Sequence, residues 1–221
     1  MLLEEIIELK KELIQYAAFV EQMLERGLRG LLEKNRELLL EVIDVDEPEA
    51  NEREIHLDES CTALIAQFEP KAKNLRTVLM ILKMSNDLER MGDHSVNIAE
   101  SSILLINQPL VKPLIDLPKM GEMTVRMLAD SINSFVEEDA QLARSVCERD
   151  ATIDAMRDQL LRELLTYMLS DSSTIERSIQ LMRIASNLER IADLCTNIGE
   201  DIVFMVQGRV IKHHQEEKSE Y

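Results

Sequence analysis

The sequence predicts an all-α fold made of two tandem three-helix bundles, six helices in total, related by a pseudo-twofold axis. Three observations support this. Aromatic residues make up only 3% of the chain, with no Trp, and the alternating β-branched patterns typical of strands are nearly missing. Apolar residues recur at spacings of three and four over long stretches, which is typical of amphipathic helices. Finally, the order long helix, shorter helix, long helix occurs twice.

The first half is expected to hold helices at residues 2–45, 52–68 and 71–107. Gly27 and Gly30 each weaken a helix interior by about 1 kcal/mol relative to Ala, so a bend is expected near them. The segment Asp46-Glu47-Pro48 is expected to stop the first helix, and Glu69-Pro70 to end the second.

A stretch at residues 108–119 carries three of the five prolines and is the expected linker. The second half is expected to hold helices at residues 120–149, 152–169 and 173–210. A turn is predicted at Ser170–Ser173, where Ser173 and Glu176 have the spacing of a capping box. The predicted organisation is a first bundle at 1–107, the linker at 108–119, a second bundle at 120–213 and a polar tail at 214–221.

An internal repeat with a period of 100 residues supports this division. The segment LERMGDHSVNIAE at 88–100 aligns with LERIADLCTNIGE at 188–200, and seven of the thirteen positions are identical. Such a match indicates that the two halves share one structural unit. The small residues Gly92, Ser95 and Ala99 would let a neighbouring helix approach closely.

The repeated segment places polar side chains along one face of a helix. At 100° per residue, four of them fall within an 80° arc. We call these sets the first and second acidic stripes. They consist of Glu89, Asp93, Asn97 and Glu100, and of Glu189, Asp193, Asn197 and Glu200.

Three interpretations of the stripes stay open from the residues alone. The first is a solvated acidic face. The second is ion pairing that fixes helix packing, with Glu89 and Asp93 bound to Arg90, Arg76 or Arg126. The third is metal binding, because carboxylates at i and i+4 can hold a hard cation that relieves their repulsion.

The ligand types limit the metal. Oxygen-only ligands favour Mg, Mn, Ca or a carboxylate-bridged iron cluster over zinc. The Glu-x-x-His signature of ferritin-like sites is missing, since positions 92 and 192 are Gly and Ala. His94 is replaced by Leu194 in the second half and is expected to be a surface or packing residue.

Composition and motifs exclude several classes. The net charge of −17 disfavours nucleic-acid binding. The charged N-terminal stretch resembles neither a membrane span nor a signal peptide, so we expect a cytoplasmic protein. Cys61, Cys147 and Cys195 have no Cys-x-x-Cys spacing and are expected to be buried thiols. No nucleophile elbow, phosphate loop or zinc-protease motif is present, so no enzyme is expected.

The doubled segment resembles the signature of the PhoU family, and Ile55-His56-Leu57-Asp58-Glu59-Ser60-Cys61 resembles another segment of that family. The resemblance covers nearly the whole chain. It implies two PhoU repeats and metal clusters on Glu/Asp-x-x-x-Asp motifs. Those motifs fall here on Glu89 with Asp93 and on Glu189 with Asp193. Asn97 and Asn197, one turn further along the same stripes, are expected as auxiliary ligands, and the helical register also permits Glu100 and Glu200.

The resemblance also implies a function in phosphate homeostasis. We expect a regulator that binds the ATPase subunit of a phosphate ABC transporter and a phosphate sensor histidine kinase, and that represses uptake when phosphate is plentiful. A homodimer and peripheral recruitment to the membrane through partners are expected as well, and Mg, Mn or Fe is favoured over Zn. The alternatives are a carboxylate-bundle metalloenzyme, either a hydrolase or an oxidase, and a metal-free helical scaffold.

Overall fold

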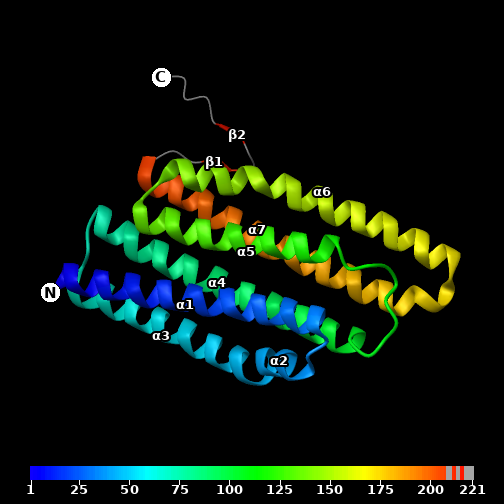
Figure 1. Cartoon of the computed structure of the whole chain (residues 1–221). Helices are drawn as coiled ribbons and strands as arrows, with labels where there is room; N and C mark the ends of the chain where they lie inside the picture. Colours follow the sequence, from blue (N-terminus) through cyan, green and yellow to red (C-terminus); the bar gives the residue numbers. More distant parts are fainter. Residues whose placement is uncertain (208–210, 213–214, 217–221) are drawn as a thin grey trace.

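The computed structural model describes residues 1–207, 211–212 and 215–216, and these residues are almost entirely helical. Figure 1 shows the long helices lying side by side. The helices are α1 (Leu2–Glu33), α2 (Arg36–Glu41), α3 (Glu47–Phe68), α4 (Lys73–Leu105), α5 (Asp116–Glu137), α6 (Ala140–Ser170) and α7 (Ile175–Gln207). A π-helical turn, η1 (Val42–Asp46), joins α2 to α3, and a 3₁₀ turn, η2 (Ser172–Thr174), precedes α7. The all-α prediction is confirmed.

The six long helices form two sets of three (Figure 1). Helices α1 and α3 pack on α4, and helices α5 and α6 pack on α7. The two sets meet where α4 packs against α7 and α1 against α5. At the centre, apolar side chains of α4 and α7 such as Leu88 and Leu188 are fully buried. Burying such a side chain stabilises the folded chain by about 1.5–3 kcal/mol.

The predicted helix at 2–45 is wrong. Helix α1 continues through Gly27 and Gly30 and ends at Glu33, where Lys34 has φ 53°. The side chain of Asn35 then accepts hydrogen bonds from the main-chain N–H groups of Glu37 and Leu38, at 3.0 and 3.3 Å. A left-handed residue followed by an Asn cap ends one helix and starts the next.

The predicted break at Asp46-Glu47-Pro48 is also wrong, because η1 leads directly into α3. Pro48 lies in the first turn of α3, where a missing N–H costs nothing. The buried carboxylate of Asp46 accepts two hydrogen bonds from Nη1 of Arg26 in α1, both at 2.5 Å. This pair ties the start of α3 to α1.

The predicted division between two helices at residues 149–152 is also wrong. As after α1, the break lies instead at a left-handed residue followed by a capping residue. Helix α5 ends at Glu137, Glu138 has φ 53°, and α6 then runs unbroken from Ala140 to Ser170. Asp139 caps α6 by accepting from the N–H groups of Gln141 and Leu142 at 2.8 and 3.0 Å. Both halves therefore use the same two-residue turn.

Other boundaries are closer to expectation. Helicity breaks at residues 106–115, although α5 begins before Pro118. The turn after Ser170 is confirmed, but its cap is Asp171, which accepts from the N–H of Ser173 at 2.9 Å. Whether each half is a separate domain stays a prediction.

The C-terminal calls are tested only in part. Strands β1 (Ile211–Lys212) and β2 (Gln215–Glu216) pair antiparallel. The end of the last helix at 208–210 and most of the predicted tail lie outside the described residues.

Small residues allow close helix packing, as the sequence predicts. Gly92 is buried beside Met23 of α1 and Ala50 of α3. Cys61, Cys147 and Cys195 are also buried and unpaired in disulfides, which confirms the expectation. Burial raises the pKa of the Cys61 thiol to about 12 and that of Cys147 to about 11.

Replacing Gly199 by Ala is expected to destabilise the protein by about 1–3 kcal/mol, because overpacking forces backbone to move. A Cβ at Gly199 would lie 2.9 Å from the main-chain oxygen of Ala143 in α6 and 3.0 Å from Sγ of Cys147. Urea denaturation measures the effect. The control is Gly27→Ala, whose Cβ would meet nothing closer than 3.6 Å and which gains up to about 1 kcal/mol of helix propensity. Equal midpoint shifts for both variants would contradict the packing argument.

Candidate functional site

The first acidic stripe lies on α4, with its members at different depths. Glu89 and Asn97 are half-buried, whereas Asp93 and Glu100 are exposed. Nδ2 of Asn97 donates to the main-chain oxygen of Asp93 at 2.9 Å. This bond holds the amide along the stripe and leaves its side-chain oxygen available.

Two neighbouring helices add groups to the first stripe. Burial raises the pKa of Glu89, and the negative charges of Asp93 and of Glu54 in α3 raise it further. Tyr16 of α1 is 1% exposed, and its hydroxyl has no hydrogen-bond partner among the described residues. Burial raises the pKa of Tyr16 first, and the charges of Glu89, Glu54 and Asp93 add to the effect. Helices α3 and α4 thus supply carboxylates whose charges influence one another, and α1 supplies a buried hydroxyl near them.

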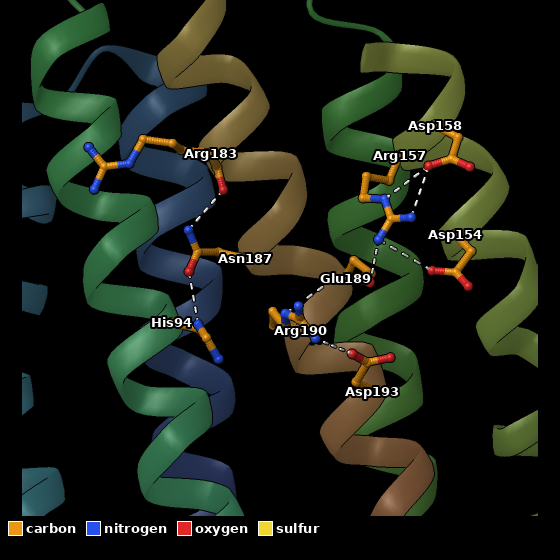
Figure 2. A network of polar contacts seen from close by, with 9 residues as sticks. All are labelled: His94, Asp154, Arg157, Asp158, Arg183, Asn187, Glu189, Arg190 and Asp193. Atoms are coloured by element: carbon orange, nitrogen blue, oxygen red, sulfur yellow. Dashed lines mark hydrogen bonds and ion pairs between the residues drawn. The ribbon is translucent and has the colours of Figure 1, made fainter. Parts of the chain in front are cut away.

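The second acidic stripe, on α7, is paired with arginines instead (Figure 2). Glu189 is buried, at 7% exposed, and binds Nη1 of Arg157 from α6. Arg190 lies 3.7 Å from Glu189 and 3.2 Å from Asp193. Burial raises the pKa of Glu189 and Asp193 adds to it, while the two arginines oppose the rise.

Arg157 contacts further carboxylates on its own helix. Its Nη2 lies 2.9 Å from Oδ1 of Asp158, and its Nη1 lies 3.8 Å from Oδ1 of Asp154. Figure 2 shows the guanidinium between these two residues and Glu189. The ion-pairing interpretation therefore describes the second stripe, through Arg157, which the sequence analysis did not identify. In the first half, Arg90 pairs with Asp87 instead, at 3.6 Å. Within the described chain, neither Arg76 nor Arg126 forms an ion pair with Glu89 or Asp93.

The sequence analysis also missed the carboxylates on α3 and α6. Glu54 and Asp58 stand 100 residues before Asp154 and Asp158, the same offset that relates the stripes. The negative charge of Glu54 raises the pKa of Glu89, and that of Asp154 raises the pKa of Glu189 in the same way. The repeat period applied beyond the doubled segment would have found all four residues.

The remaining candidates lie further along α7. Asn197 is exposed and Glu200 is half-buried. As arranged, no three His, Cys, Asp or Glu side chains of the described residues converge on a metal-sized position. The assignment of the eight stripe residues as ligands stays a prediction.

Polar contacts also cross between the halves. Nδ1 of His94 in α4 lies 2.8 Å from Oδ1 of Asn187 in α7, and the amide of Asn187 donates to the main-chain oxygen of Arg183 at 2.8 Å. His94 is thus a half-buried contact residue, as expected. Nζ of Lys83 in α4 binds the carboxylate of Asp201 in α7 at 2.7 Å.

An apolar hollow lies away from the stripes. It encloses about 180 Å³ where α1 and α4 end and the linker passes, and it includes Leu31, Ile106, Leu110 and Leu181. No stripe residue lines it. In the described part of the chain, no helix is both long enough and apolar enough to span a bilayer.

Comparison with known proteins places these features in context. The family model described as "PhoU domain" matches residues 13–102 and 117–202. A relative from Aquifex aeolicus, named "Phosphate-specific transport system accessory protein PhoU homolog", is 38% identical over 220 residues, covering 99% of each chain. A PhoU from Edwardsiella tarda is 31% identical over 209 residues, covering 95% of this chain and 86% of its own.

Solved structures agree. The crystal structure of PhoU from Pseudomonas aeruginosa has a TM-score of 0.90 at 29% identity, covering 94% of this chain and all of that one. A phosphate transport system regulatory protein PhoU from Streptococcus pneumoniae has a TM-score of 0.89 at 28% identity, covering 96% of this chain and all of that one.

Asp87→Asn is expected to stabilise the protein at neutral pH, by up to about 3 kcal/mol at pH 7. Burial, helped by the charge of Asp201, raises the pKa of Asp87 from 3.8 to about 6, against opposing effects of Arg90 and Lys83. A carboxyl with a raised folded-state pKa stabilises the fold at low pH and loses that contribution as pH rises from about 4 to about 6.

The measurement is urea denaturation from pH 4 to 8, with Asp44→Asn, at an exposed side chain, as the control. The difference between Asp87→Asn and the parent should grow through that pH window and be smallest near pH 4. A difference that stays constant with pH would show that folding does not raise the pKa of Asp87.

Proposed function

The chain belongs to the PhoU family, and on that premise we propose that it regulates phosphate uptake and phosphate-responsive signalling. The observation that carries the proposal is the match of both halves to the PhoU domain, together with relatives named as phosphate transport accessory proteins over nearly the whole chain. We propose that it binds the ATPase subunit of a phosphate ABC transporter and a sensor histidine kinase, and represses uptake when phosphate is plentiful.

The proposed mechanism is binding rather than catalysis. A regulator of this kind changes its partner's activity by having different affinities for two of the partner's states. The groove between α1 and α5, of about 470 Å³, is a candidate docking surface because both halves contribute charged side chains to it, among them Arg29 and Arg126. A homodimer in the cytoplasm, recruited to the membrane only through partners, completes the proposal.

We also propose that the acidic stripes supply a metal site for Mg, Mn or Fe rather than Zn. The first stripe fits best, because burial raises the pKa of Glu89 and the negative charges of Asp93 and Glu54 raise it further. Carboxylate oxygens are the ligands that such hard cations prefer. A bound cation would neutralise this cluster and stabilise the contact between α3 and α4.

Two other functions are distinguished by specific results. A carboxylate-bundle metalloenzyme needs a substrate-sized apolar pocket beside the carboxylates. The hollow beside Glu54 and Asp58 is lined almost entirely by charged and polar side chains, and the apolar hollow lies elsewhere. A metal-free scaffold is favoured instead by the arginine pairs of the second stripe. Neither alternative explains the similarity to phosphate transport accessory proteins.

Reversing the groove charges in Arg29→Glu with Arg126→Glu is expected to weaken capture of the transporter's ATPase subunit at least about tenfold, equivalent to about 1.4 kcal/mol. The measurement is co-purification from cells grown in high phosphate. Arg162→Glu, on the exposed face of α6, is the matched control and should bind normally. Failure of the parent to bind the subunit at any phosphate level would refute the regulatory proposal.

Changing Glu89, Asp93, Glu189 and Asp193 together to Ala is expected to remove bound metal, since it removes the carboxylates of both stripes. Elemental analysis of parent and variant purified without chelator measures this, and circular dichroism checks that the variant folds. Equal metal content in both proteins would exclude the stripes as ligands.

A further inference from the structure

The two halves place different residues at one matched position between their acidic helices. In α6, Arg157 lies three residues after Asp154 and one before Asp158. In α3, the residue at the same place between Glu54 and Asp58 is Leu57, which is 2% exposed. The repeat therefore preserves the carboxylates but exchanges an apolar residue for a cation.

The guanidinium of Arg157 lies where carboxylates from two helices meet. It binds Glu189 of α7 and Asp158 of α6, with Asp154 at 3.8 Å. The side chains of Arg157 and Glu189 are only 26% and 9% exposed, so water screens the pair weakly. Arginine keeps its charge at every relevant pH. The position that a divalent cation would need is thus taken by a permanent cation of the chain.

In the part of the chain that the structure describes, the first stripe has no counter-charge paired with it, because Arg90, whose charge lowers the pKa of Glu89, forms its ion pair with Asp87 at 3.6 Å. Within the described residues, Glu54, Glu89 and Asp93 form no ion pair with Lys or Arg inside 4.0 Å. The side chain of Tyr16 is buried, its hydroxyl has no hydrogen-bond partner among the described residues, and the charges of these three carboxylates raise its pKa in addition to burial. Over its described residues, the first half therefore lacks the internal cation that Arg157 supplies in the second half.

We propose that Arg157 permanently takes the place of a metal ion in the second half, so that the second acidic stripe does not hold a divalent cation while Arg157 is present. The inference rests on the proposed metal function and deepens it. It assigns the second stripe a structural role, namely holding α6 to α7 through an internal cation.

The test follows Mn²⁺ binding to the full chain by the loss of the free-ion electron paramagnetic resonance signal. Glu89→Gln with Asp93→Asn should weaken Mn²⁺ binding at least about tenfold, since two charged ligands are neutralised. The matched pair Glu189→Gln with Asp193→Asn should leave Mn²⁺ binding as in the parent. Loss of Mn²⁺ from the second pair would overturn the inference.

The gain-of-site variant is Arg157→Leu, which copies the residue of the first half. Removing the guanidinium leaves Glu189 buried beside Asp154, Asp158 and Asp193 without their main counter-ion. The melting temperature should fall without metal and recover in Mn²⁺, and the bound Mn²⁺ should rise about twofold as a second site opens. Arg157→Gln serves if the Leu variant does not fold.

The outcomes separate the two proposals. A folded Arg157 variant that binds no more Mn²⁺ than the parent, with no recovery of melting temperature, overturns the role given to Arg157. If the parent binds no Mn²⁺, the metal part of the proposed function fails. Mn²⁺-dependent recovery of the Arg157 variant would still uphold the arginine as the cation of the second half.

Discussion

The packing of α4 against α7 is the contact on which the other helices depend. Each of these two helices is buried on several sides and carries one copy of the doubled segment. Helices α1 and α3 lie on one of them, and α5 and α6 on the other (Figure 1). Because both copies must present apolar residues to this centre, their charged residues are confined to the remaining face. The stripes therefore lie where a third helix, α3 or α6, can reach them.

The repeat and the long helices were predictable because they depend on periodic burial, which leaves a clear pattern in the sequence. The turns at Lys34–Asn35 and Glu138–Asp139 were not, because a left-handed residue of Lys or Glu followed by a capping Asn or Asp does not interrupt that pattern. Proline and glycine, which often interrupt helices, instead led us to expect breaks and bends that the structure does not have. Pro48 occupies a first turn that accepts it, and Gly27 and Gly30 lie inside a helix held by tertiary packing.

The candidate site was predictable only along single helices. Helical spacing correctly placed Glu89 with Asp93 on one face, and Glu189 with Asp193. It could not show that Arg157 or Tyr16 approaches them, because those contacts depend on how helices far apart in sequence pack. The same doubled motif thus has two electrostatic environments, and only the residues contributed by the neighbouring helices distinguish them.

The three buried thiols allow the tight packing of the helices to be followed by a chemical reaction. Only the thiolate reacts readily with alkylating reagents, and burial disfavours that form at Cys61 and Cys147. Cys195 is fully buried on α7, the helix that packs against α4. Labelling of Cys195 therefore requires the helices around it to separate, so its rate reports how often they do. Cys195 is thus a natural reporter of transient helix separation, and no cysteine has to be introduced.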